Sequence, residues 1–203
     1  MEHNTNQITL RGNLSAPPTF SHENHGKQFY RFFLEVPRLS GAADILPVIA
    51  EASLLESAGI DPGGMLTVTG QIRSHNVRTD GRRHLMIFVF ASALTCEDGE
   101  ALNDAELEGF LCREPIYRRT PLGREICDVM LAVSRPYHRT DYLPCILWGR
   151  TAQCAAGLPV GAQIALAGRL QSRGYVKVLP EGTEERTAYE LSAMELEILE
   201  ENF

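Results

Sequence analysis

Short segments in which apolar and polar residues alternate run along the whole chain, separated by turn residues. In the second half they lie near residues 104–111, 124–134, 141–149, 162–177 and 186–199, and they are rich in β-branched and aromatic residues. An apolar residue at every second position is the pattern of a half-buried β-strand. Residues 151–156 break this period and fit a short helix, with Thr151 as the candidate N-cap.

The sequence repeats itself with a shift of 97 residues. Residues 10–14 (LRGNL) recur as 107–111 (LEGFL), and residues 44–47 (DILP) recur as 141–144 (DYLP). One inserted residue later, GQIRS at position 70 matches GRLQS at position 168. A register kept over so many positions indicates two copies of one structural unit.

Five strands with a helix between the third and the fourth is the order of an OB-fold, a five-stranded Greek-key barrel that often binds oligonucleotides or oligosaccharides. We therefore predict an all-β chain of two tandem OB-fold barrels, each with one short helix. We place the first domain at residues 1–98, a short polar linker at 99–103 and the second domain at 104–203.

Charge is distributed unevenly between the two copies. The 203 residues are 44% hydrophobic and 22% charged, which is ordinary for a globular protein, and the formal net charge is −7. Between Gly109 and Lys177, however, ten Arg and Lys residues stand against four acidic residues, while acids gather between Glu181 and Glu201. A basic second copy is compatible with a nucleic-acid partner in spite of the negative total.

Several classes of protein are disfavoured by what the sequence lacks. No apolar run is long enough to span a membrane and no secretory signal is found, so we expect a cytoplasmic protein. Phosphate-loop, nucleophile-elbow and HExxH signatures are absent, so we expect no enzyme activity, no cofactor and no metal. His22 and His25 are assigned to a polar hairpin loop. The cysteines are odd in number and form no C-x-x-C pair, and we interpret them as small core residues: Cys96, Cys112, Cys127, Cys145 and Cys154.

Alternation along residues 141–149 separates two kinds of side chain. One side carries Tyr142, Pro144, Ile146 and Trp148, and the other is apolar and suited to the core: Leu143, Cys145 and Leu147. The sole tryptophan and a tyrosine would then be free to stack on bases. The alternative is that Trp148 packs in the core or in a subunit interface.

The strand that follows residue 168 combines positive charge with an aromatic ring. One side of it carries Arg169, Gln171, Arg173, Tyr175 and Lys177. Cations attract phosphates and rings stack on bases, and neither interaction reads sequence. The alternative is a solvated outer strand face.

Five sequence words of the second copy resemble the bacterial single-stranded DNA-binding protein family: EGFL at 108, RTPLGR at 119, LAVS at 131, DYLPCILWGR at 141 and GRLQSRGY at 168. The resemblance implies OB barrels with single-stranded DNA wrapped across their strands, and four such domains per assembly, here as a homodimer. It assigns base stacking to four residues: Tyr137, Tyr142, Trp148 and Tyr175. It assigns phosphate contacts to seven arginines, to which the strand pattern adds Lys177: Arg119, Arg124, Arg135, Arg139, Arg150, Arg169 and Arg173.

The first copy departs from this pattern at its most specific positions. The four stacking residues become Ser40, Ile45, Glu51 and Val77. Weaker DNA contacts are expected from Arg38, Arg73 and His75. Aromatic residues occur elsewhere: Phe20, Phe29, Tyr30, Phe32 and Phe33. We expect this domain to build the oligomer or to present a surface to another protein.

These features together predict sequence-tolerant binding of single-stranded DNA in replication, recombination or repair. The alternative is an OB-fold interaction module of a primosome or mobile element, with little affinity for DNA. The acidic residues before Phe203 are similar to the family's acidic tip, which recruits replication and repair proteins, or else they only finish the last strand.

Overall fold

The computed structural model describes residues 6–60, 63–79, 82–179 and 182–199. The first half contains six strands and a helix: β1 (Asn6–Leu14), β2 (Thr19–Asn24), β3 (Lys27–Pro37), β4 (Ala43–Glu51), α1 (Ala52–Ala58), β5 (Met65–Thr79) and β6 (Arg82–Cys96). The second half repeats this order: β7 (Leu102–Leu111), β8 (Ile116–Arg119), β9 (Glu125–Arg135), β10 (Arg139–Trp148), α2 (Gly149–Ala156), β11 (Gln163–Leu179) and β12 (Gly182–Ile198). The two halves therefore have the same element order.

Five strands of each half close into a barrel. In the first barrel, β1 pairs with both β3 and β5, β3 pairs with β4, β4 runs parallel to β6, and β6 returns to β5. The second barrel closes in the same way through β7, β9, β10, β12 and β11. This Greek-key order, with one helix between the third and fourth barrel strands, confirms the predicted pair of tandem OB-folds.

The repeated sequence words mark positions with the same role in both barrels. Leu10 on β1 and Leu107 on β7 are 0% and 1% exposed, and one apolar cluster runs through both barrels. Gly12 and Gly109 leave room for a neighbouring backbone, since a Cβ atom there would lie 2.4 Å from the Glu35 carbonyl oxygen and 2.5 Å from that of Ala132. The shared pattern of the two words is therefore a packing requirement of the fold.

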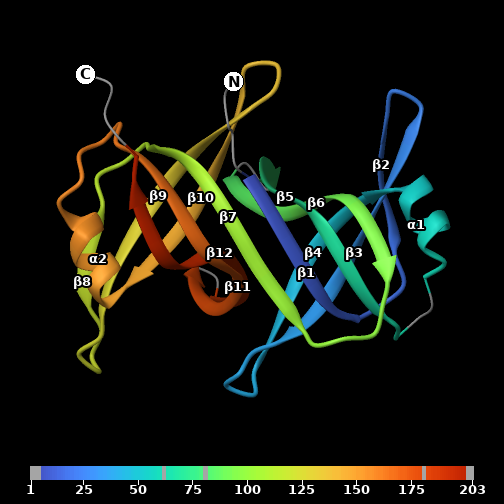
Figure 1. Ribbon diagram of the computed structural model, residues 1–203, viewed down its shortest axis with the longest axis horizontal. Coiled ribbons are helices and arrows are strands. Elements are labelled where there is room, and N and C mark those ends of the chain that lie inside the picture. Colours follow the sequence, from blue (N-terminus) through green and yellow to red (C-terminus); the bar gives the residue numbers. More distant parts are fainter. Residues whose placement is uncertain (1–5, 61–62, 80–81, 180–181, 200–203) are drawn as a thin grey trace.

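The two barrels are joined edge to edge through their first strands. β1 and β7 form an antiparallel pair from Asn6 opposite Leu107 to Arg11 opposite Leu102, and they run side by side across the middle of the molecule (Figure 1). The two helices lie at opposite ends of the molecule (Figure 1). Backbone pairing and a shared core thus make the two barrels one body.

A buried carboxylate of the first barrel reaches into the second. Asp44, at the start of β4, is 1% exposed and accepts a hydrogen bond from the backbone N–H of Ser172 on β11, at 2.6 Å. Arg38 donates to the same carboxylate at 2.5 Å and to the Ser172 carbonyl oxygen at 2.7 Å. The carboxylate and the guanidinium of the first barrel therefore bind the backbone N–H and C=O groups of one residue of the second.

An equivalent contact runs in the opposite direction. Asp141 on β10, one repeat after Asp44, is 0% exposed and accepts a hydrogen bond from the backbone N–H of Ser74 on β5, at 2.7 Å. It forms ion pairs with Arg73 of the first barrel at 3.1 Å and with Arg135 of its own barrel at 3.4 Å. The DILP and DYLP words thus supply the two halves of a pseudo-symmetric connection.

Some local predictions need correction. Each half has a short extra strand, β2 or β8, that the sequence patterns did not indicate; among the described residues each pairs only with the strand that follows it. Thr151 is not the N-cap of α2, because β10 runs directly into the helix and Trp148 takes that place. The predicted domain limits stay a prediction; the structure begins β7 at Leu102, two residues before the expected start of the second domain at residue 104.

Candidate nucleic-acid interface

The outer side of β10 presents the two predicted aromatic residues. Tyr142 is 45% exposed and Trp148 is 39% exposed. On the other side, Leu143, Cys145 and Leu147 are buried. The expected alternation of exposure holds at Tyr142 and Trp148 but not at Ile146, which is only 6% exposed, and within this chain Trp148 does not belong to the core.

Two hydrogen-bonded contacts hold Trp148 in place at the end of β10. Its indole Nε1–H donates to the Ser192 Oγ at 2.9 Å, which fixes the ring against β12. Its backbone carbonyl oxygen accepts a hydrogen bond from the Thr151 hydroxyl at 2.8 Å. Gly149 follows with a φ of +54°, a left-handed value that suits glycine. A ring that is both fixed and partly exposed is a preorganised platform for stacking.

The long hairpin of β11 and β12 carries the third aromatic residue. Tyr175 is 39% exposed, and the Arg173 guanidinium carbon lies 6.0 Å from the centroid of its ring. Arg173 also pairs with Glu190 at 3.3 Å, and Lys177 stands opposite Glu184. The hairpin thus combines an exposed ring with cations that are partly balanced by acids on β12.

Tyr137 occupies the tip of the hairpin between β9 and β10. It is 92% exposed, and it and His138 have φ values of +64° and +54°. Positive φ angles are uncommon for residues other than glycine. The turn holds the phenol ring in solvent, at the end of the strand that carries Tyr142.

The predicted phosphate-binding arginines divide into two groups. Arg119, Arg135 and Arg173 form ion pairs with Glu125, Asp141 and Glu190. Arg124, Arg139 and Arg150 are exposed, and within the described ranges they form no ion pair. The second group is better placed to meet phosphates, because binding to DNA would break no existing ion pair.

Two arginines of the first barrel are held in ion pairs with buried carboxylates. Arg38 pairs with Asp44, and Arg73 pairs with Asp141. Burial lowers the pKa of Arg73, and the hydrogen bond to Asp141 acts in the opposite direction. His75 is exposed. DNA contact by these three residues stays a prediction.

The positions equivalent to the stacking residues carry no ring in the first barrel. Ile45 is 39% exposed, and Glu51 forms an ion pair with Lys27 at 2.9 Å. Hydrogen bonds from Lys27 and Ser53 hold the pKa of Glu51 below its usual range. A carboxylate therefore stands where the second barrel has its tryptophan.

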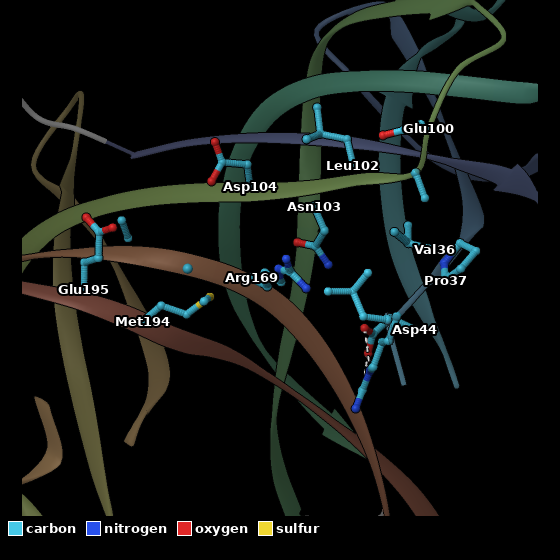
Figure 2. A pocket seen from close by; sticks show the side chains of 15 residues that line it. Val36, Pro37, Asp44, Glu100, Leu102, Asn103, Asp104, Arg169, Met194 and Glu195 are labelled. Atoms are coloured by element: carbon cyan, nitrogen blue, oxygen red, sulfur yellow. Dashed lines mark hydrogen bonds and ion pairs between the residues drawn. The ribbon is translucent and has the colours of Figure 1, made fainter. Parts of the chain in front are cut away.

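A hollow of about 600 Å³ lies at the junction of the two barrels. Arg169 points into it, with Asp104 and Glu195 near its rim and Met194 beside them (Figure 2). Asp44 of the first barrel lines its other side (Figure 2). Sequence reasoning did not find this hollow, because it exists only through the placement of the two barrels. Because Arg169 lines this hollow and is only partly exposed, its surroundings differ from those of the exposed arginines.

The cysteines do not all lie in the core, as the sequence had suggested. Cys127 and Cys145 are buried, but Cys96 and Cys154 are exposed and Cys112 is partly exposed. Cys96 ends β6, and Cys154 lies away from the buried side of α2, which is formed by Ala152 and Ala155. All five are free thiols.

Thiol reactivity should follow this division. Burial raises the pKa of Cys127 and Cys145, so their reactive thiolate forms are suppressed at neutral pH. We expect iodoacetamide to modify Cys96 and Cys154 rapidly in the native protein and to leave Cys127 and Cys145 intact until denaturant is added. Peptide mass mapping over time measures this, and rapid modification of Cys145 would contradict the assigned burial.

Other kinds of site find little support in the described residues. None of their helices is long and apolar enough to cross a membrane. In the same part of the chain, no three or more His, Cys, Asp or Glu side chains are grouped to hold a metal ion. His22 stacks on Phe29 with ring centroids 4.8 Å apart, in the β2–β3 hairpin whose turn is His25 and Gly26. The terminal residues Glu201 to Phe203 lie outside the described residues.

Comparison with known proteins points to one family. Residues 102–199 match the profile of the single-strand binding protein family. The chain is 32% identical over 95 residues to the single-stranded DNA-binding protein of Oceanobacillus iheyensis, which covers 43% of this chain and 56% of that protein. It is 31% identical over 108 residues to single-stranded DNA-binding protein 3 of Listeria innocua, covering 49% and 64%. The chain thus spans less than two thirds of these curated relatives.

A solved structure matches the whole double barrel. The single-stranded DNA-binding protein from Thermus aquaticus, in a deletion mutant, superposes with a TM-score of 0.80 at 25% identity, over 100% of this chain and 98% of that one. The wild-type form of that protein gives a TM-score of 0.79. Both barrels and their relative arrangement are therefore shared.

Proposed function

Because residues 102–199 of this chain match the profile of the single-strand binding protein family, we propose that the second barrel binds single-stranded DNA without reading its sequence and without altering it. The observation that carries this proposal is the exposure of three aromatic side chains on the outer strands of that barrel. Tyr142, Trp148 and Tyr175 are each at least 39% exposed. Every base has a π-face, so exposed rings of this kind bind a strand of any sequence.

Phosphate contacts would supply the remaining affinity. Arg124, Arg139 and Arg150 are exposed and free of ion pairs among the described residues. Arg139 begins β10, Arg150 follows Trp148 in α2, and Arg124 precedes β9, which pairs with β10. Neutralising a phosphate releases condensed counterions, so the binding constant should fall as salt rises. Arg119, Arg135, Arg173 and Lys177 would contribute less, because each already faces an acidic residue.

The wider biological role follows from the family. We propose that the protein acts in the cytoplasm on DNA exposed during replication, recombination or repair. Two chains would pair to give an assembly of four OB-folds. Replication or repair proteins would be its protein partners.

Intrinsic fluorescence tests the proposal directly, because Trp148 is the sole tryptophan. We expect titration with oligo-dT to quench its emission to a plateau, and the affinity to fall with salt at a log–log slope of about −0.7 per neutralised phosphate. Double-stranded DNA of the same length is the control and should quench weakly. A flat signal together with unchanged electrophoretic mobility of the oligonucleotide would reject single-strand binding and favour a protein-interaction module.

A further inference from the structure

The first barrel also has aromatic residues on its outer face, at positions that the sequence repeat does not reveal. Strand register places Phe33 on β3 opposite Pro47, and Phe90 on β6 opposite Ile49. Phe88 shares the side of Phe90. The neighbouring register, Val48 opposite Val89, is buried at 0% exposure and faces the core. Phe33, Phe88 and Phe90 therefore lie on the outside of the barrel, and we call them the phenylalanine face.

The rings of the phenylalanine face are partly accessible and have a cation beside them. All three are intermediate in exposure. The guanidinium carbon of the exposed Arg31 lies 5.9 Å from the centroid of the Phe33 ring. Phe29, on the same side of β3 as Phe33, lies beside Phe90 with ring centroids 5.8 Å apart. The face thus has the two components of a single-strand site, a stacking surface and a positive charge.

The two barrels carry different types of side chain at two equivalent positions. In the second barrel, Ser192 stands opposite Ile146 and is the small residue that holds the Trp148 indole. In the first barrel, Phe90 takes the place of Ser192, and Glu51 takes the place of Trp148. The aromatic ring has therefore moved from the end of one strand to the neighbouring strand, on the same side of the sheet.

The charged residues beside the phenylalanine face also differ from those of the second barrel. Arg31 stands where the second barrel has Asp128, which pairs there with Arg118. Glu51 is neutralised by Lys27, Arg31 lies beside the Phe33 ring, and Glu35 follows two residues after Phe33 on the same side of β3. Phe88 stands opposite Arg73, which forms an ion pair with Asp141 of the second barrel at 3.1 Å. The face therefore continues toward the second barrel across the junction.

We propose that the phenylalanine face, with Arg31, is a second binding surface for the bases of single-stranded DNA. The proposal rests on the function proposed for the second barrel and extends it to the first. It commits to a nucleic-acid strand because the rings have a cation at their edge and lie on the barrel side that corresponds to the face carrying Tyr142 and Trp148. One strand could then pass from the second barrel to the first and occupy both.

A relocated tryptophan tests the proposal. In a Trp148→Phe background, which keeps an aromatic ring on the second barrel, Phe90→Trp places the sole indole on the phenylalanine face. We expect oligo-dT long enough to span both barrels to quench this indole, and an oligonucleotide that fills only the second barrel to leave it unchanged. The matched control is Phe20→Trp in the same background, because Phe20 is 58% exposed and its neighbour Tyr30 pairs with the core residue Ala50. The control indole should stay unquenched.

Arg31→Gln is a second test, which does not depend on how the Phe90→Trp indole packs on the phenylalanine face. Arg31→Gln should reduce the log–log salt slope on the long oligonucleotide by about 0.7 and leave the slope on the short one unaltered. If the wild-type Trp148 is quenched but neither the Phe90→Trp indole nor the Arg31→Gln slope responds, the second surface is refuted and the function of the second barrel stands. If the wild-type Trp148 is itself unresponsive, the failure lies with the proposed function.

Discussion

Replacing Asp141 by alanine should lower the free energy of unfolding by about 3–5 kcal/mol, because it leaves buried partners without their counter-charge. The carboxylate is 0% exposed and serves the Ser74 backbone N–H, Arg73 and Arg135 at once. The side chain of Arg73 is only 13% exposed, so it has little water to replace the lost carboxylate. Urea denaturation followed by circular dichroism measures the change.

Asp128→Ala is the matched control for this experiment. Asp128 also pairs with an arginine, Arg118 at 2.7 Å, but their side chains are 37% and 51% exposed. An exposed ion pair contributes about 0–1 kcal/mol, so this variant should unfold close to the wild type. Equal midpoints for the Asp141→Ala and Asp128→Ala proteins would show that the buried carboxylate adds nothing to stability.

A double-mutant cycle can separate the connection between barrels from local packing. Arg73 belongs to the first barrel and Asp141 to the second, and the pair is the direct ionic link between β5 and β10. The Arg73→Ala, Asp141→Ala and double variants give the coupling energy of that link. A coupling energy of zero would assign the effect of Asp141 to its other partners, the Ser74 backbone N–H and Arg135.

The barrels and the aromatic face of β10 could be predicted because both depend on local patterns. A period of two separates Tyr142 from Leu143 whatever the rest of the chain does. The repeat then transfers the same strand order to the first half. The short strand β8 was missed because its four residues, which are all exposed, leave no buried side to detect.

Features that depend on long-range register could not be predicted in the same way. Asp141 and Ser74 are 67 residues apart, so the sequence gives no reason to expect Arg73 in a buried contact rather than at a DNA surface. The phenylalanine face requires the parallel pairing of β4 with β6, which places Phe90 beside Ile49. Comparing repeats position by position found Glu51 in place of Trp148, but it could not show that a neighbouring strand supplies a ring.

Removing two rings of the second barrel is expected to weaken oligo-dT binding most among the variants of that face. Stacking of one base on an aromatic side chain contributes about 1–3 kcal/mol, so Trp148→Ala and Tyr175→Ala should each raise the dissociation constant roughly 5- to 150-fold. The two residues lie on different strands, β10 and β11, and have different neighbours: the Trp148 indole bonds to Ser192 and the Tyr175 ring lies beside Arg173. Their free-energy changes should therefore add in the double variant.

Fluorescence anisotropy of a labelled oligonucleotide measures these affinities without the native tryptophan. Phe20→Ala is the control, since it removes an exposed ring that lies on the opposite face of the sheet from Phe33 and Phe90. Trp148→Phe should recover most of the affinity lost in Trp148→Ala, because a ring is restored although the hydrogen bond to Ser192 is not. Affinity that survives loss of both rings would mean that phosphate contacts alone hold the strand, and the salt slope would then be as steep as in the wild type.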